Sequence, residues 1–245
     1  MKSVAHRMAA RLGLEEQARH AWQMARPAVR RDLAERAQLR RLVAWTVPRD
    51  GHCIDVGSHA GEILHDLVRV APDGRHIAYE PLPAFASELQ AAFPAVDVRA
   101  KALANENGER AFTHVVGNPG WSGFRPRPTP HAEAFVAMTV EVERLDDALP
   151  AAFRPAFIKI DVEGAELEVL QGALETLKAY RPIVAFEHGA GSADHYGTEP
   201  GDVHALLTRD ARLRIYDLAG DGPYSVADFR RAFADGLRVN FVARS

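Results

Sequence analysis

One short segment, DVGSHAG at residues 55–61, constrains the fold more than any other part of the chain. It follows an apolar run at residues 53–56 that is typical of a buried strand, and it precedes apolar residues at helical spacing over 63–68. Its two glycines permit a tight turn in which backbone amides can approach a ligand, and the start of the next helix favours an anionic group. The segment therefore predicts the first strand, turn and helix of an open α/β sheet, with a small-molecule site at the turn.

The rest of the chain continues this alternation of strands and helices. Further strands are expected at residues 76–79, 96–99, 157–160, 183–186, 213–216 and 239–242, with amphipathic helices between most of them. We predict a Rossmann-like, doubly wound sheet of seven mostly parallel strands with right-handed crossovers.

Two more strand patterns, at 110–116 and 134–142, flank a stretch rich in Gly and Pro over 117–130. We expect a small β insertion over 110–142 that carries a mobile loop.

The N-terminal segment differs from the rest in charge. Residues 1–50 carry eleven Lys and Arg against five Asp and Glu, a net charge of +6 in a chain whose total is −3. Asp32 with Glu35 forms a capping-box pattern that predicts a helix over 32–46. We interpret residues 1–46 as a solvated helical extension; the alternative is a contact surface, such as the interface of a homodimer or a surface for an acidic partner.

Composition and cysteine content limit the class of protein. Hydrophobic residues make up 47% and charged residues 26% of the chain, which excludes a disordered protein. The single Cys53 falls in a strand pattern and cannot form an internal disulfide, which fits a reducing compartment. Because no apolar run has the length of a signal peptide or a membrane span, we expect a cytoplasmic protein without a membrane partner. We do not expect a nucleic-acid partner.

The spacing at the turn separates two classes of cofactor. A dinucleotide fingerprint needs G-x-G-x-x-G, whereas His59 stands at the middle position here and would crowd a pyrophosphate. Glu80 closes the next strand, where a carboxylate can accept two hydrogen bonds from a ribose diol. Each feature alone fits any Rossmann-like domain, but together they favour S-adenosylmethionine. The residues expected to bind it are Asp55, Gly57, Ser58, His59 (through its backbone), Gly61 and Glu80.

Three stretches resemble the FkbM family of methyltransferases: IDVGSHAG at 54–61, YEPLP at 79–83 and FIKIDVEGAE at 157–166. VLQGA at 169–173 and RPIVAFE at 181–187 support the match, which extends over roughly residues 50–245. The resemblance implies a class I methyltransferase domain, which we place at 47–245, and O-methylation of a hydroxyl on a sugar, polyketide or other secondary metabolite. It also implies that the backbone of Lys101, Ala102 and Leu103 lies beside the adenine.

An alcohol acceptor must lose its hydroxyl proton as the new bond forms, which requires a general base or a metal ion. Lys159 and Asp161 close one predicted strand and Glu187 and His188 close the next, so these four are the candidate catalytic residues, with Asp161 also a candidate cofactor contact. Two arrangements remain open. Either the acids and the nitrogen hold Mg²⁺, or His188 is the base and Asp161 or Glu187 orients it.

Other polar residues receive weaker assignments. Trp121 with Asn118 and Ser122 could form an acceptor-binding lid within 117–130, although an ordinary surface loop fits equally well. His195 and Tyr196 are further candidates for acceptor contact. Acids at 163 and 166 are interpreted as complementing a helix dipole.

The sequence thus predicts an S-adenosylmethionine-dependent O-methyltransferase acting on a small-molecule hydroxyl. The alternatives are a non-catalytic partner subunit with the same fold and an NAD-dependent oxidoreductase.

Overall fold

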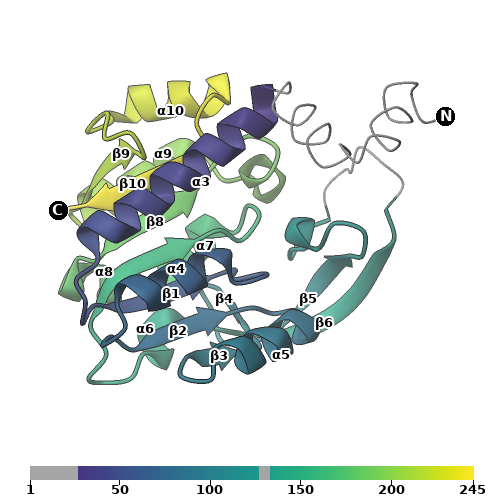
Figure 1. Cartoon of the computed structure of the whole chain (residues 1–245). Coiled ribbons are helices and arrows are strands. Elements are labelled where there is room, and N and C mark those ends of the chain that lie inside the picture. The colour runs from purple at the N-terminus through teal and green to yellow at the C-terminus, as the bar shows by residue number, and fades with distance from the viewer. Residues whose placement is uncertain (1–26, 127–132) are drawn as a thin grey trace, which may run out of the picture. The chain divides into compact units, whose positions relative to one another are not determined.

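The computed structural model describes residues 27–126 and 133–245 (Figure 1). The chain divides into two compact units between Arg41 and Leu42, and the helix α3 (Pro27–Thr46) contains this division. The helix begins at Pro27, so the expectation that Asp32 caps its start is wrong. Proline suits the first helical position because its fixed φ matches the helix and its missing N–H is not needed there. The division of the sequence at 46/47 stays a prediction.

The main sheet has seven strands in the order β3-β2-β1-β7-β8-β10-β9 (Figure 1). All neighbouring strands are parallel except β10, which is antiparallel to both β8 and β9. This confirms the predicted Rossmann-like sheet of mostly parallel strands. The bounds are β1 His52–Val56, β2 His76–Tyr79, β3 Asp97–Arg99, β7 Pro155–Ile160, β8 Ile183–Glu187, β9 Arg214–Asp217 and β10 Asn240–Arg244.

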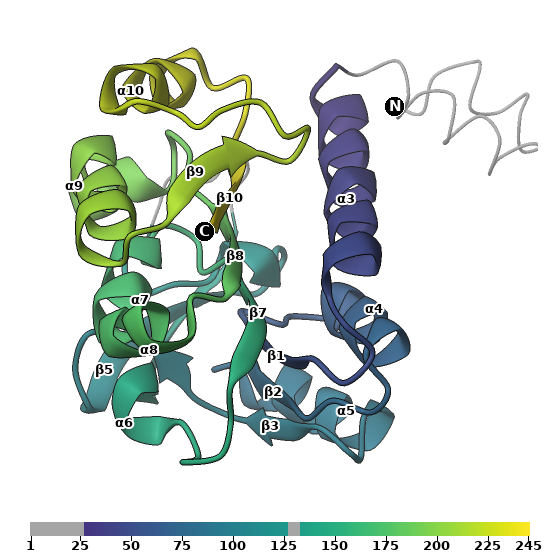
Figure 2. The ribbon, with the colours of Figure 1, turned by 90° about the vertical axis from the view of Figure 1, so that its left-hand side faces the viewer.

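Helices cover both faces of the sheet (Figure 2). On one face lie α4 (Glu62–Val70) and α5 (Pro83–Ala92), whose Leu64 and Leu89 pack on Ala78 of β2. The other face carries α6 (Leu145–Ala148), α7 (Glu166–Gly172), α8 (Leu174–Tyr180), α9 (Pro200–Ala205) with the π-helix η3 (Leu206–Asp210), and α10 (Val226–Asp235). Their apolar side chains share the larger core cluster with the strands. None of the helices in the described part of the chain combines the length and apolar composition needed to cross a bilayer.

The sequence pattern at 167–177 indicated one helix, but the structure has two. The break falls at Ala173, directly after the last residue of α7. Gly172 passes so close to another segment that a Cβ there would lie 1.9 Å from the carbonyl oxygen of Ala104. This long-range contact, rather than any local breaker, coincides with the interruption.

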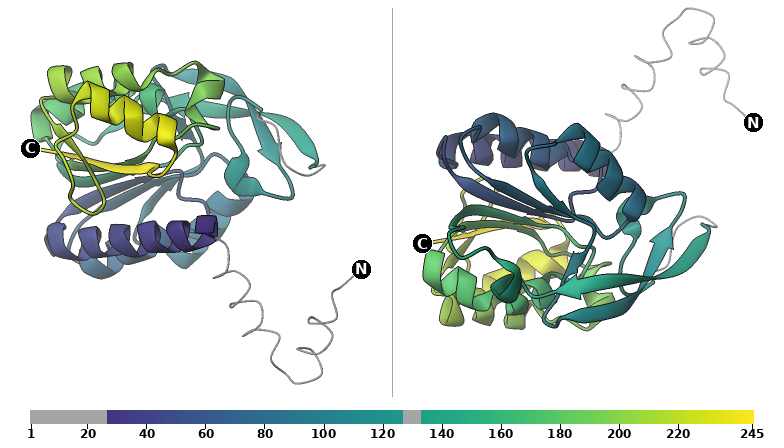
Figure 3. Two further views of the ribbon diagram at one scale, coloured as in Figure 1. Left: turned by 90° about the horizontal axis from the view of Figure 1, so that it is seen from above. Right: turned by 90° about the horizontal axis from the view of Figure 1, so that it is seen from below.

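A second, smaller sheet confirms the predicted β insertion. It has the order β4-β6-β5 and consists of β4 (Ala102–Leu103), β5 (Gly108–Val115) and β6 (Phe135–Glu143). The last two form an antiparallel hairpin that extends beyond the layers of the main sheet (Figure 3). Residues 127–132 of the predicted loop lie outside the described residues.

Four parallel strands of the main sheet end at the same level. Val56 pairs with Tyr79 of β2 and with Ile160 of β7, and Ile160 pairs in turn with Phe186 of β8. The residues that follow these positions therefore meet at one edge, where open α/β sheets bind their ligands.

Candidate functional site

The turn after β1 is held between the ends of β2 and β7. The backbone amides of Gly57 and Ser58 donate to the carbonyl oxygen of Tyr79 at 3.0 and 3.1 Å. Gly57 has φ of +74°, and a Cβ on it would lie 1.9 Å from the carbonyl oxygen of Asp161. Ser58 Oγ donates to the carbonyl oxygen of Asp55 at 2.9 Å. Glycine is therefore required at position 57 both by backbone conformation and by space.

The second half of the turn leads into α4 and is packed against α5. Gly61 has φ of +79°, and a Cβ on it would lie 2.6 Å from Leu89. His59 also has a positive φ, of 46°, and its ring stacks on Phe85 with 4.5 Å between the ring centroids. The imidazole thus packs on α5, and the expected contact of the His59 backbone with the cofactor stays a prediction.

Glu80 joins the turn to the end of β2. Its Oε2 accepts from the His59 amide at 2.8 Å and its Oε1 from the Leu82 amide at 2.9 Å. The residue is 5% exposed, and burial raises the pKa of the carboxyl group against the opposing effect of the two amides. A carboxylate oxygen can accept two hydrogen bonds. Each oxygen of Glu80 therefore retains an acceptor position, as binding of a ribose diol requires.

The stretch that was expected beside the adenine forms the short strand β4. Ala102 and Leu82 belong to one apolar cluster, so this backbone lies near the end of β2. Leu103 is buried and pairs with Glu143 of β6. Lys101 Nζ donates to Glu143 Oε2 at 2.9 Å, and this hydrogen bond is the main reason that the pKa of Lys101 is raised. The Lys101 side chain is thus directed to a carboxylate of the small sheet.

The ends of β2, β3 and β6 share a network of polar side chains that the sequence did not predict. Tyr79 Oη donates to Glu143 Oε1 at 2.9 Å, and Arg99 Nη1 donates to the same oxygen at 3.0 Å and to Tyr79 Oη at 2.6 Å. Burial opposes ionisation of Glu143, but its hydrogen bonds with Lys101, Tyr79 and Arg99 outweigh it and lower the pKa. The network ties β2 and β3 to the small sheet.

Lys159, the penultimate residue of β7, reaches from that strand to the turn after β1. Its Nζ donates to the carbonyl oxygen of Gly57 at 2.7 Å and lies 3.4 Å from Asp55 Oδ1 and 3.5 Å from Asp161 Oδ2. Burial lowers the pKa of Lys159, but the two carboxylates outweigh it, and the pKa is raised. Lys159 therefore contributes a fixed positive charge. The ion pair is also the main compensation for Asp55, which is 1% exposed and whose oxygens accept no hydrogen bond.

Asp161 and Glu187 form a carboxyl pair at the ends of β7 and β8. Ile160 pairs with Phe186, so the residues that follow them are neighbours at this edge. Burial, followed by repulsion from Asp161, Glu163 and Glu166, raises the pKa of Glu187 well above its ordinary value. The Asp161 side chain is 39% exposed. The two acids are therefore brought together as the sequence predicted, and their proximity disfavours ionisation of both at once.

Glu166 lies in the first turn of α7, as its interpretation as a complement to the helix dipole requires, but it also has a second role. It is 1% exposed, and its Oε1 accepts from the amides of Val162 and Gly164 at 3.1 and 3.0 Å. Burial raises its pKa to about 7 against these hydrogen bonds. Glu166 shapes the turn after β7, in which Glu163 and Gly164 both have positive φ. The DVEG segment with its glycine carried a signal for a tight turn, but burial of Glu166 depends on the surrounding fold.

His188 occupies a different environment from the one expected. Its ring is fully buried and packs against Phe229, 5.5 Å between centroids, and Phe233, 4.9 Å away, both on α10. Neither ring nitrogen has a hydrogen-bond partner, and burial lowers the pKa to about 4. The hypothesis that Asp161 or Glu187 orients His188 is therefore wrong, because successive strand residues point to opposite faces of the sheet.

The candidate lid is an ordered turn over the part that the structure describes. Residues Pro119–Trp121 form the 3₁₀-helix η1, and the backbones of Thr113 and Gly123 pair with each other. Ser122 is buried, and its Oγ accepts from the Val115 amide at 3.0 Å, so its hydroxyl supports the turn. Asn118 and Trp121 are partly buried at the ends of this turn.

The turn lies close to the carboxyl end of β7. A Cβ at Gly120 would be 4.0 Å from Glu163 Oε1.

Tyr196 links this turn to the end of β8, whereas His195 is exposed. Tyr196 belongs to the 3₁₀-helix η2 (Ala193–Tyr196), and its Oη accepts from the Arg125 amide at 3.2 Å. Burial raises the pKa of Tyr196 to about 12. Arg125 also donates through Nη1 to the His195 carbonyl oxygen at 3.2 Å. Arg125, which the sequence did not single out, therefore fastens the turn to η2.

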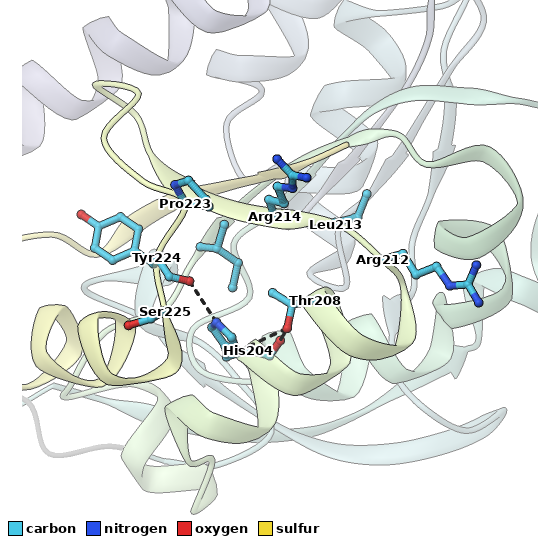
Figure 4. A pocket seen from close by; sticks show the side chains of 9 residues that line it. His204, Thr208, Arg212, Leu213, Arg214, Pro223, Tyr224 and Ser225 are labelled. Atoms are coloured by element: carbon cyan, nitrogen blue, oxygen red, sulfur yellow. Dashed lines mark hydrogen bonds between the residues drawn. The ribbon is translucent and has the colours of Figure 1, made fainter.

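A cavity of about 480 Å³ lies apart from this edge, between η3, β9 and the start of α10 (Figure 4). His204 Nε2 makes a 3.0 Å hydrogen bond with the Tyr224 carbonyl oxygen, and Thr208 Oγ1 donates to the His204 carbonyl oxygen at 2.7 Å. The guanidinium groups of Arg212 and Arg214 extend in different directions rather than toward one point. The cavity contains none of the residues predicted for the site.

Comparison with known proteins agrees with this geometry. A family model described as the methyltransferase FkbM domain matches residues 55–215, from the first turn to β9. The chain belongs to the FkbM methyltransferase family. Methyltransferase 1 of Beauveria bassiana (strain ARSEF 2860) is 28% identical over an alignment of 147 residues that covers 51% of this chain and 59% of that protein.

A solved FkbM structure shows the same fold. The methyltransferase FkbM from Methylobacillus flagellatus KT superposes with a TM-score of 0.51 at 17% identity, covering 81% of this chain and 44% of that protein. A putative rRNA-methylase from Clostridium thermocellum gives a TM-score of 0.49 at 7% identity, covering 86% of this chain and 94% of that protein. The chain thus spans about half the length of the FkbM protein that it resembles. Its fold is that of a class I methyltransferase.

Membership of the FkbM family implies S-adenosylmethionine as cofactor, and the residues present fit it. The tight turn with positive φ at Gly57 and Gly61 stands at the carboxyl end of β1, where such sheets bind ligands, and Glu80 offers unused acceptor positions at the end of β2. The expectation of Mg²⁺ receives no support. Among the described residues, no three His, Cys, Asp or Glu side chains are arranged to hold a metal ion, and His188 faces α10.

Proposed function

We propose that this FkbM methyltransferase transfers a methyl group to a hydroxyl oxygen of a small molecule such as a sugar, a polyketide or another secondary metabolite. The observation that carries the proposal is the pair of carboxyl groups, Asp161 and Glu187, at the ends of neighbouring strands beside the turn that holds Gly57. An alcohol oxygen becomes a good nucleophile only as its proton leaves, and a carboxylate within hydrogen-bond reach is a suitable acceptor for that proton.

The chain's own residues supply binding and positioning. Asp55, Gly57, Gly61 and Glu80 would hold S-adenosylmethionine, whose sulfonium supplies an electrophilic methyl group when bound. As the new O–C bond forms and the S–C bond breaks to leave a neutral thioether, the hydroxyl proton passes to the carboxyl pair. Atoms and charge balance without a further reactant, and holding the acceptor oxygen in line supplies much of the acceleration.

The turn around Trp121 and the η2 segment with Tyr196 would bind the acceptor. Both lie near the carboxyl ends of β7 and β8, because Gly120 approaches Glu163 and Tyr196 approaches Gly164. An aromatic face next to polar groups is suited to a sugar ring or an apolar alcohol. An acceptor lid at this position therefore stays a proposal for Asn118, Trp121 and Tyr196, whereas Ser122 has a supporting role within the turn.

The test uses purified protein, methyl-labelled S-adenosylmethionine and a panel of glycosides and polyketide alcohols, each paired with its deoxy analogue. We expect label in the alcohol and none in the deoxy analogue, with the methylated oxygen assigned by mass spectrometry and NMR. Parallel reactions with EDTA should give the same rates. Label that appears only on nitrogen acceptors, or in the deoxy analogue as well, would contradict O-methylation, and loss of turnover with EDTA would restore a metal-dependent mechanism.

A further inference from the structure

We infer that Asp161 and Glu187 have separate roles and that Lys159 assigns them: Asp161 is the carboxylate that receives the acceptor's proton, and Glu187 is a positioning residue that holds the proton shared by the pair. This inference rests on the proposed function, since it assigns the steps of that reaction to individual oxygen atoms.

The first observation is that the pair has a cation on one side only. Lys159 Nζ lies 3.5 Å from Asp161 Oδ2, and it is fixed there by the Gly57 carbonyl oxygen at 2.7 Å and by Asp55 at 3.4 Å. The strand order β1-β7-β8 places Asp55 and Glu187 on opposite sides of β7. The ammonium group therefore stabilises the ionised form of Asp161 more than that of Glu187.

The second observation is the negative charge around Glu187. Asp161, Glu163 and Glu166 all disfavour its ionisation, in addition to burial. Two neighbouring carboxyl groups resist ionising together, and the remaining proton stays on the group whose ionised form is less stable. The groups facing the pair are thus Lys159 and Asp55 from the side of β1, and Glu163 and Glu166 from the turn and α7.

The third observation is access. The Asp161 side chain is 39% exposed at the carboxyl end of β7. An acceptor hydroxyl can therefore reach Asp161, next to Glu187 at the end of β8. In the transfer, the hydroxyl O–H bond breaks and its proton forms an O–H bond with Asp161, while the electron pair of the hydroxyl oxygen forms the bond to the methyl carbon. Asp161 then returns the proton to water.

The test compares Asp161→Asn with Glu187→Gln, two changes that conserve size. Asn cannot accept a proton, so we expect kcat/KM to fall about 10³-fold for Asp161→Asn, within the range for loss of a general base. Gln at 187 can still donate to Asp161, so we expect a loss of about tenfold there, equivalent to roughly 1.4 kcal/mol. Glu175→Gln is the matched control because that side chain is 70% exposed on α8, and its activity should equal that of the wild type.

A readout without turnover is infrared difference spectroscopy of the protein above pH 8, where Glu166, with a pKa of about 7, is ionised. The Glu187→Gln variant should lack a protonated carboxyl band that is present in the wild-type spectrum. The Asp161→Asn variant should lack a carboxylate band that is present in the wild-type spectrum.

Lys159→Met tests whether the lysine keeps Asp161 ionised. If Lys159→Met fails to fold because Asp55 is left buried without a cation, the double variant Asp55→Asn with Lys159→Met takes its place. In either variant the ionised pair loses its neighbouring cation, so the acid limb of the kcat/KM profile should move to higher pH.

The inference is overturned if kcat/KM falls equally in Asp161→Asn and Glu187→Gln, or falls more in Glu187→Gln. It is also overturned if the two variants lose each other's expected infrared band, or if the acid limb of the pH profile does not move. A wild-type protein that methylates no hydroxyl would instead contradict the proposed function, and the infrared bands would still test the assignment of the proton.

Discussion

Gly57 connects the cofactor turn with the catalytic strand end at the scale of one residue. Its backbone lies against the carbonyl group of Asp161, the residue to which we assign the proton transfer. The absence of a side chain therefore allows β1 and β7 to bring cofactor and acceptor together. Glu80 connects the same turn with the end of β2, because its carboxylate accepts a hydrogen bond from the His59 amide. Its oxygens keep further acceptor positions, which we propose for a ribose.

Gly57→Ala should abolish cofactor binding and lower the free energy of unfolding. Its Cβ would lie 1.9 Å from the Asp161 carbonyl oxygen, in a backbone with φ of +74°. Gly220→Ala is the matched control, since Gly220 has φ of +94° with nothing within 4 Å of a Cβ. A positive φ alone costs about 1–2 kcal/mol, and we expect Gly57→Ala to cost at least about 2 kcal/mol more than the control. Urea unfolding measures both, and equal losses would mean that the turn relaxes freely.

Glu80→Gln should weaken binding of S-adenosylhomocysteine by roughly tenfold or more. The carboxylate of Glu80 accepts one hydrogen bond from each of two backbone amides. Gln would turn an N–H group toward one of these amides in place of an oxygen, so that hydrogen bond is lost and the turn shifts. Isothermal titration calorimetry gives the affinity. Glu88→Gln on the exposed side of α5 is the control for the same chemical change. An unchanged affinity in Glu80→Gln would remove Glu80 from the cofactor site.

At the scale of elements, strand β8 shows how one strand end serves two environments. Glu187 is its last residue and joins Asp161 at the catalytic edge, whereas the next residue, His188, packs on Phe229 and Phe233 of α10. Alternation along an extended chain sends the two side chains to opposite faces. The imidazole therefore belongs to the contact between β8 and α10 rather than to the reaction.

His188→Phe should leave turnover within a few-fold of the wild type and make the protein less sensitive to acid. The pKa of His188 is lowered from 6.5 to about 4 by burial, so between these pH values the unfolded chain binds a proton that the folded protein does not. Stability of the wild type consequently falls as pH decreases from about 6.5 to 4, by up to about 3 kcal/mol.

Urea unfolding from pH 7.5 to pH 4 should show this loss in the wild type and a smaller one in the variant. Loss of turnover in a folded His188→Phe protein would return His188 to the list of candidate bases.

At the scale of the whole molecule, the residues assigned to the site lie between Asp55 and Tyr196, which falls within the segment matched by the family model. Strands β1, β2, β7 and β8 carry the residues proposed for cofactor binding and catalysis, and the small sheet with its turn carries those proposed for the acceptor side. The basic N-terminal segment contributes none of these residues. Its role as the interface of a homodimer stays a proposal, based on its net charge of +6 over residues 1–50.

A protein lacking residues 1–26 should bind S-adenosylhomocysteine with an affinity within about twofold of the full chain, a difference of less than 0.5 kcal/mol by the usual relation. The reason is that all residues proposed to hold the cofactor remain. Calorimetry measures this, and light scattering of both proteins shows whether removal of the basic segment changes the oligomeric state. A lost affinity would show that the segment completes the site, and an unchanged mass would contradict its role in a homodimer.

The features that the sequence determined by itself are local in origin. The strand at 53–56, the turn with Gly57 and Gly61 and the acid at 80 each follow from patterns within a few residues, because apolar periodicity and glycine dihedrals act over that range. The alternation of strands and helices follows from the same periodicity, together with the handedness of crossovers. This is why the doubly wound sheet and the turn after its first strand could be predicted, whereas the individual cofactor contacts stay predictions.

Other features were decided only by tertiary structure, since they depend on which distant groups approach. Contact with α10 holds His188 away from Asp161 and Glu187, and burial gives Glu166, expected only to complement a helix dipole, a role as a support of the turn. The close approach of Gly172 to Ala104 accompanies the break between α7 and α8. Lys159 gained its role from Asp55, which is distant in sequence but adjacent in the sheet. Periodicity predicts which face of an element is buried, but only the packed fold determines what it is buried against.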